Sequence, residues 1–90
     1  MFVRVTRGRL DPARFDDLAG IAPDIAAEMR AQPGFQSYLA AGDRATGKLI
    51  AVTTWDTREH ASLPFLAGVG PRLQAIGVQL DAPEIYQSFE

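Results

Sequence analysis

The stretch Leu49–Ala61 reads LIAVTTWDTREHA and contains an apolar run, the only Trp, a helix-start pattern and the only His. Its first half is apolar on both faces, because Leu49 and Ala51 alternate with Ile50 and Val52. A continuous apolar run of this kind indicates a strand whose sheet is covered on both sides. The following Asp-Thr-Arg-Glu resembles a capping box that opens a helix. The stretch therefore predicts a central strand followed directly by a helix.

Upstream, the sequence predicts a strand, a helix and a second strand. Residues 2–10 alternate as a half-buried strand does. Asp11-Pro12 is typical of a helix start, and Pro33-Gly34 of a helix end. Because Pro23 cannot donate a hydrogen bond to Ala19, we expect a kink or short break near Gly20–Pro23.

Downstream, the sequence predicts a divided helical region and a closing strand. The polar loop 42–47 has the length of a hairpin between strands over 35–41 and 48–55. Pro71 is well placed to start another short helix, and residues 84–89 alternate as a strand. This order predicts a ferredoxin-like βαββαβ fold of the α+β class, a four-stranded antiparallel sheet with helices on one face.

A second copy of the chain is expected to cover the other face of that sheet. Residues 1–90 make a single domain with a small core, and the absence of Cys rules out disulfides. Further apolar side chains come from Phe2, Phe35, Leu39, Ile85 and Phe89. An open apolar face of that size is not expected on a monomer. We therefore expect a homodimer packed sheet to sheet. Ala51→Asp should disrupt the open face and unfold the chain rather than release a stable monomer.

Composition excludes several classes of partner and site. The net charge of -2 and the pI near 5.3 provide no basic surface, so we expect no nucleic-acid partner. One His and no Cys make a zinc site unlikely to form, and no metal is expected. The chain begins with a strand pattern and has no long apolar run. We expect a soluble, cytoplasmic protein with no signal peptide and no membrane contact.

The sequence from Pro33-Gly34-Phe35 through the hairpin to LIAVTTWDTREHA resembles the antibiotic biosynthesis monooxygenase domain. That family belongs to the dimeric α/β-barrel superfamily, and the resemblance covers Val3 to Phe89 in order and length. It implies a homodimer whose sheets form a barrel-like interface, with a small-molecule pocket in each subunit. Some relatives oxidise polyketide anthrones or quinols with molecular oxygen and no cofactor, and others degrade haem.

This chain departs from the catalytic branches of that family. It has no Asn, which both the haem-degrading and the anthrone-oxidising branches use. Only Trp55 matches the anthrone-oxidising pattern in place, and Arg72 lies in a similar region. The resemblance implies a cofactor-independent monooxygenase acting on a small aromatic or polyketide-like molecule. The alternative is a non-catalytic dimer that binds a small hydrophobic molecule or stabilises an operon partner.

Six residues are candidates for a site. His60 could be a general base, because its unperturbed pKa lies near neutrality, or could be a solvent-exposed neighbour of Asp56. Tyr38 and Tyr86 could donate to a substrate oxygen, or could be half-buried aromatic residues of the sheet. The substrate-binding candidates are Trp55, Phe65 and Arg72. Trp55 could border a pocket or cap the core, and Arg72 could bind an anion or lie in solvent.

Overall fold

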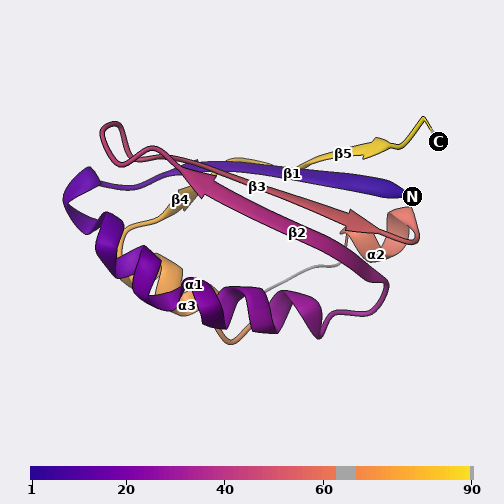
Figure 1. Cartoon of the computed structure of the whole chain (residues 1–90), viewed down its shortest axis with the longest axis horizontal. Coiled ribbons are helices and arrows are strands. Elements are labelled where there is room, and N and C mark those ends of the chain that lie inside the picture. Colours follow the sequence, from indigo (N-terminus) through magenta and orange to yellow (C-terminus); the bar gives the residue numbers. More distant parts are fainter. Residues whose placement is uncertain (63–66, 90) are drawn as a thin grey trace.

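The computed structural model describes residues 1–62 and 67–89, and it has the α+β architecture expected from the sequence (Figure 1). The elements are, in chain order, β1 (Phe2–Arg9), the 3-10 helix η1 (Pro12–Arg14), α1 (Phe15–Arg30), β2 (Phe35–Gly42), β3 (Lys48–Trp55), α2 (Arg58–Ser62), α3 (Gly70–Ala75), β4 (Gln79–Leu80) and β5 (Glu84–Gln87). The predicted hairpin loop and the short helix at Pro71 are both present.

The sheet has the strand order of a ferredoxin-like fold, but its last position is divided. Within the described residues it has five strands, in the order β2-β3-β1-β4, and β5 also pairs with β1. The strand β4 pairs with the Gly8–Arg9 end of β1, while β5 pairs with residues 2–5. Pro83 lies between them and cannot donate to a ladder, which explains the division. The predicted fourth strand is therefore present as two short strands, β4 and β5, along the same edge of β1.

The helix α1 is continuous through the segment where the sequence suggested a short break. It runs from Phe15 to Arg30 with Pro23 inside it, so the predicted break near Gly20–Pro23 does not occur. Pro23 and Ala19 are both exposed, so water can bind the carbonyl that lost its N–H partner. Packing of Ile25 and Met29 in the core holds the second half of the helix in line.

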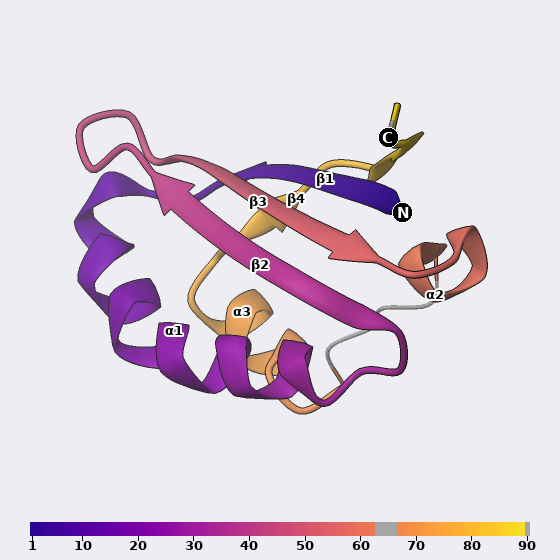
Figure 2. The same cartoon turned by 45° about the vertical axis from the view of Figure 1, so that its right-hand side comes forward.

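Helices cover one face of the sheet only. Figures 1 and 2 show α1 and α3 together on one side, with α2 beside the end of β3. No described helix lies on the opposite face. Within the described residues, no helix is long and apolar enough to cross a membrane.

Register and packing assign each strand residue to a face. Leu49 packs against the core beneath α1, and Trp55 packs with Met29, so the odd positions of β3 face the helices. Ala51 therefore lies on the covered face, and the expectation that Ala51→Asp would disrupt the open face is wrong. Sequence periodicity identifies residues that share a face, but it does not say which face the helices cover.

The open face has a different composition from the one predicted. Phe2, Phe35 and Ile85 pack around Trp55 on the covered side, so they do not contribute to the open face. Leu39 is correctly placed there and is 69% exposed. Pairing with β3 and β1 places further apolar and aromatic side chains on the open face, namely Val3, Val5, Ile50, Val52 and Tyr86. The same pairing places the polar residues Arg7, Ser37, Thr54 and Glu84 on that face.

The core consists of two clusters. The first lies between the sheet and the helices α1 and α3, and its buried members are Leu10, Ile25, Val69, Leu73 and Val78. The second lies at the other end of α1, and its buried members are Met29, Trp55 and Ala61. Tyr38 packs against both clusters. It therefore stands at the junction of the two halves of the core.

Candidate functional site

A cavity of about 730 Å³ lies between the covered face of the sheet and the helices α1 and α3. Its volume is within the range of pockets that hold drug-sized molecules, roughly 300–1,000 Å³. Most of its lining is apolar, and representative side chains are Phe15, Leu18, Ala22, Leu49, Ala51 and Leu73. The cavity is thus shaped and lined for a small hydrophobic molecule.

The polar side chains among the described lining residues are Arg4, Thr6, Tyr38, Gln74 and Asp81, and the two that bear on a ligand site are Arg4 of β1 and Tyr38 of β2. Arg4 is partly buried, and its Nη1 donates a hydrogen bond to the carbonyl oxygen of Ala61 at 3.0 Å. Burial lowers the pKa of Arg4 and raises the pKa of Tyr38, because it disfavours the charged form of each group. Tyr38 therefore stays protonated at neutral pH and can donate a hydrogen bond.

Arg4 and Tyr38 belong to one cross-strand row. Both pair in register with Thr53 of β3, which lies between them. Because adjacent strands are about 4.8 Å apart, the two backbones are separated by roughly 10 Å. That separation lets both side chains reach one ligand from opposite sides.

The other end of the cavity contains two glycines, apolar side chains and the exposed Asp81, which follows Leu80, the partner of Gly8. Gly8 and Gly42 both pair with Leu49, four residues along β3 from Thr53. That spacing corresponds to roughly 13 Å along the strand. A Cβ added at Gly42 would lie 2.9 Å from both Leu49 Cδ2 and Phe15 Cε2, so a larger residue would displace the lining. The cavity is therefore elongated, with Arg4 and Tyr38 at one end and a mostly apolar end at the other.

Trp55 is placed in the core and not in the lining of the cavity. Its side chain is 0% exposed and lies edge-on to Phe35, with ring centroids 5.7 Å apart. Its Nε1 donates a hydrogen bond to Thr53 Oγ1 at 2.8 Å. Both the ring and the N–H are thus used within the protein, and the geometry agrees with the structural alternative for this residue.

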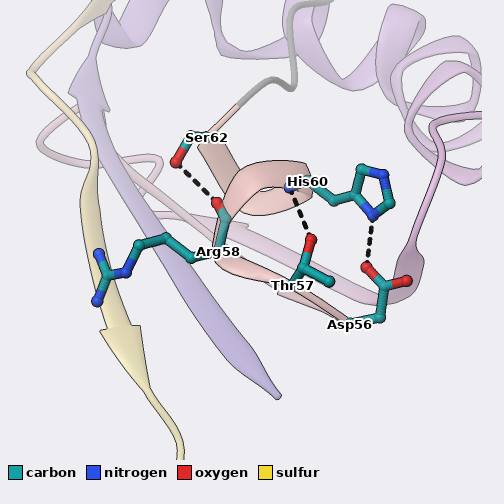
Figure 3. A network of polar contacts seen from close by, with 5 residues as sticks. All are labelled: Asp56, Thr57, Arg58, His60 and Ser62. Carbon is teal, nitrogen blue, oxygen red and sulfur yellow. Dashed lines mark hydrogen bonds and ion pairs between the residues drawn. The ribbon is translucent and has the colours of Figure 1, made fainter.

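His60 lies in a small polar network outside the cavity (Figure 3). Its Nδ1 is 2.6 Å from Asp56 Oδ1, and its backbone N–H donates to Thr57 Oγ1 at 3.1 Å. The hydrogen bond to His60 is the main cause of a lowered pKa at Asp56. Thr57 is therefore the cap of α2, while Asp56 binds the imidazole instead of capping the helix.

Gly34 explains why the Asp56–His60 pair can form. A Cβ at Gly34 would lie 2.2 Å from Asp56 Oδ1 and 2.3 Å from His60 Nδ1, and this glycine has φ 76°. Only glycine combines this backbone conformation with so close an approach. The Pro33-Gly34 that ends α1 thus also makes room for the pair.

The other sequence candidates are dispersed. Tyr86 lies on the open face, is 52% exposed and donates a hydrogen bond to Glu84 Oε1. Arg72 of α3 forms an ion pair with Asp24 of α1 at 2.7 Å and is absent from the cavity lining. Phe65 lies outside the described residues. Of the five candidates within the described residues, the structure brings only Tyr38 to the cavity.

Arg4 was not predicted as a site residue. It lies in an alternating strand, where an Arg is normally expected to face solvent. One feature of the sequence could have identified it, since Arg4 shares its row with Phe2, an aromatic residue that is expected to be buried. Within residues 1–62 and 67–89, no group of three or more His, Cys, Asp or Glu could hold a metal ion.

No model of a known protein family matches this sequence, and no curated protein sequence matches it. Solved structures do match it along the whole chain. A candidate antibiotic biosynthesis monooxygenase from Deinococcus radiodurans is 20% identical with a TM-score of 0.79, over 100% of this chain and 94% of that one. SnoaB, a cofactor-independent oxygenase from Streptomyces nogalater, is 18% identical with a TM-score of 0.67, over 99% and 93%.

A third match, HapK from Hahella chejuensis, is 12% identical with a TM-score of 0.82, over 99% of this chain and 93% of that one. The ferredoxin-like α+β fold of the single chain is therefore confirmed, and the chain shares it with structures named as antibiotic biosynthesis monooxygenases. At identities of this size the likeness concerns the fold, because one fold supports many chemistries.

Proposed function

We propose that this chain binds a small aromatic or polyketide-like molecule in the cavity and oxidises it with molecular oxygen, without a cofactor. The observation that carries the proposal is the elongated apolar cavity with Tyr38 and Arg4 at one end. An apolar pocket with a few convergent polar groups is the usual form of a small-molecule site. The structural likeness to SnoaB, named as a cofactor-independent oxygenase, supports the choice of reaction.

The proposed reaction converts a CH₂ group between two aromatic rings into a ketone. Loss of one proton gives a carbanion, which adds to oxygen and forms a C–O bond, and a proton then completes a hydroperoxide. Removal of the second C–H proton breaks the O–O bond and releases hydroxide, which a proton converts to water. The carbon loses four electrons and the oxygen molecule gains four, so one oxygen atom ends in the ketone and the other in water.

Tyr38 has a defined role in this proposal. Its hydroxyl makes no hydrogen bond with another described residue, and it is not sealed inside the protein. It can therefore donate to a substrate oxygen on which negative charge collects as the carbanion forms. A hydrogen bond of this kind lowers the pKa of the substrate, which is what an oxidation without a cofactor requires.

Binding without chemistry is the second candidate, and one observation favours it. Among the described residues that line the cavity, the ionisable groups are Arg4, Tyr38 and Asp81. None of these is a His, and the only His of the chain is bound to Asp56 elsewhere. Because the described lining has no His, proton removal is left to water or to Asp81, which is already bound to Arg9.

Oxygen consumption separates the two candidates. The chain is incubated with a panel of anthrones, quinols and flavonoids, and products are identified by mass spectrometry. The proposed function predicts oxygen uptake with one compound class, which Tyr38→Phe should lower by about tenfold or more. Ala51→Leu fills the middle of the cavity and should abolish both uptake and binding. Binding of panel members without any oxygen uptake would favour the second candidate.

We also propose that the chain forms a homodimer through the open face of the sheet. That face presents Val3, Val5, Leu39, Ile50 and Val52 without a described helix over them. A second copy would bury these side chains from water and complete a dimeric α/β barrel. Light scattering at about 50 µM should give twice the chain mass of 9.8 kDa, and the monomer mass would refute the proposal. Leu39→Asp should shift the equilibrium toward monomer.

A further inference from the structure

We infer that the ligand of the cavity is an aromatic carboxylate and that Arg4 binds its carboxylate group. The inference rests on the proposed use of the cavity as a ligand site and adds the chemical class of the ligand. It depends on how Arg4 differs from the other arginines and on the charge and shape of the rest of the cavity.

Arg4 is partly buried and has no carboxylate partner among the described residues; Arg30 and Arg58 also form no ion pair there, but both are exposed. Five arginines form ion pairs with Asp or Glu at 2.6–3.2 Å: Arg7, Arg9, Arg14, Arg44 and Arg72. All five side chains are between 46% and 64% exposed, where an ion pair contributes little. Arg4 is more buried than these and forms no ion pair with a described residue.

A partly buried cation without a counter-ion is unfavourable. The guanidinium has five N–H donors, and Arg4 uses one of them on the Ala61 carbonyl. No buried side-chain nitrogen of the described residues lacks a partner, so the remaining donors of Arg4 are still accessible. A bound carboxylate would accept two of them side by side, which is the geometry that guanidinium groups favour.

The charge of the cavity favours a monoanion. Arg4 is the only cationic side chain among the described residues of the lining, and Asp81 is the only anionic one. Asp81 is already bound to Arg9 at 3.2 Å, so it does not neutralise Arg4. A phosphate dianion would need a second cation, whereas a carboxylate is singly charged and ionised at neutral pH.

The shape of the cavity sets the orientation of this ligand. Arg4 lies in the row of Thr53, and the glycine end lies roughly 13 Å along β3. With its carboxylate at Arg4, the aromatic part extends toward Phe15 and Leu49, and Tyr38 can donate to an oxygen on the ring. The proposed reactive carbon then lies between a fixed anionic group and the apolar end.

Calorimetry with two probes of matched shape tests the inference on the full chain. The wild type is titrated with 2-naphthoate and with 2-naphthamide, which replaces the carboxylate by a neutral amide. We expect 2-naphthoate to bind at least about tenfold more tightly, and its affinity alone to fall as salt is added. This comparison uses no variant and does not depend on how Arg4 substitutions fold.

Variants then assign the preference to Arg4. Arg4→Met should remove the preference for 2-naphthoate while binding of 2-naphthamide persists, and Arg4→Lys should keep part of the preference. Arg30→Met is the matched control, because Arg30 is exposed at the end of α1 and its loss changes the net charge equally.

Two results would overturn the inference in distinguishable ways. Equal binding of the two probes, or a preference that survives Arg4→Met, refutes the carboxylate but leaves the cavity as a ligand site. Failure of both probes to bind the wild type refutes the carboxylate and the proposed use of the cavity together.

Discussion

The strongest stability prediction concerns Glu28, which attaches α3 to α1. Its carboxylate accepts hydrogen bonds from the backbone N–H groups of Gly68 at 2.7 Å and Val69 at 2.9 Å. Val69 is 4% exposed and directly precedes α3, whose residues Pro71 and Leu73 line the cavity. Glu28 thus links the ligand site to the long helix across more than a third of the chain.

The cost of removing this carboxylate follows from the two N–H groups. The N–H of exposed Gly68 can bind water instead, while that of buried Val69 loses its partner. Hydrogen bonds to charged groups contribute about 1.5–3 kcal/mol, so Glu28→Ala should lower the free energy of unfolding by about 2–3 kcal/mol. Glu28→Gln keeps one acceptor oxygen and should cost about 1 kcal/mol.

Urea denaturation at one fixed protein concentration measures these differences, and thermal melting gives a second reading. For a domain of this size each 1 kcal/mol shifts Tm by about 4–8 °C. The control is Glu59→Ala, an exposed glutamate of α2. Glu28→Ala should also weaken 2-naphthamide binding, because α3 is less firmly held. If Glu28→Ala stays within about 0.5 kcal/mol of the wild type, the reasoning is refuted.

Three further outcomes are expected. Trp55→Phe should cost about 2 kcal/mol, because it loses buried ring area and the hydrogen bond to Thr53, and calorimetry should show unchanged ligand affinity; a loss of affinity would place Trp55 in the site. His60→Ala should change stability by no more than about 0.5 kcal/mol and leave oxygen uptake intact, and a collapse of turnover would make His60 the base. The lowered pKa of Asp56 and of Glu84 means that their stabilisation is present above about pH 4 and is lost as pH falls further. The urea midpoint of the wild type should therefore fall as the pH is lowered below about 4, and the midpoint of Asp56→Asn should fall less. An equal fall of the midpoint with pH in the two proteins would contradict this.

The fold was largely readable from the sequence, since its signals are local. Asp11 accepts a hydrogen bond from the Ala13 N–H at 2.9 Å, as its position before Pro12 predicted. The alternation of β1 and the apolar run of β3 predicted adjacent half-buried and buried strands. The predicted break at Pro23 does not occur, because packing along the whole of α1 outweighs the loss of one hydrogen bond.

The candidate site was only partly readable. Tyr38 lines the cavity, so its contact with a ligand stays a prediction, while Trp55 and Arg72 are not among the lining residues. The sequence by itself determined which residues share a face, because side chains alternate with a period of two along a strand. Only the tertiary structure decided which face the helices cover, because β3 is apolar on both faces and either choice would bury similar area. That choice buried Trp55, directed Ala51 into the cavity and left Arg4 beside it without a carboxylate.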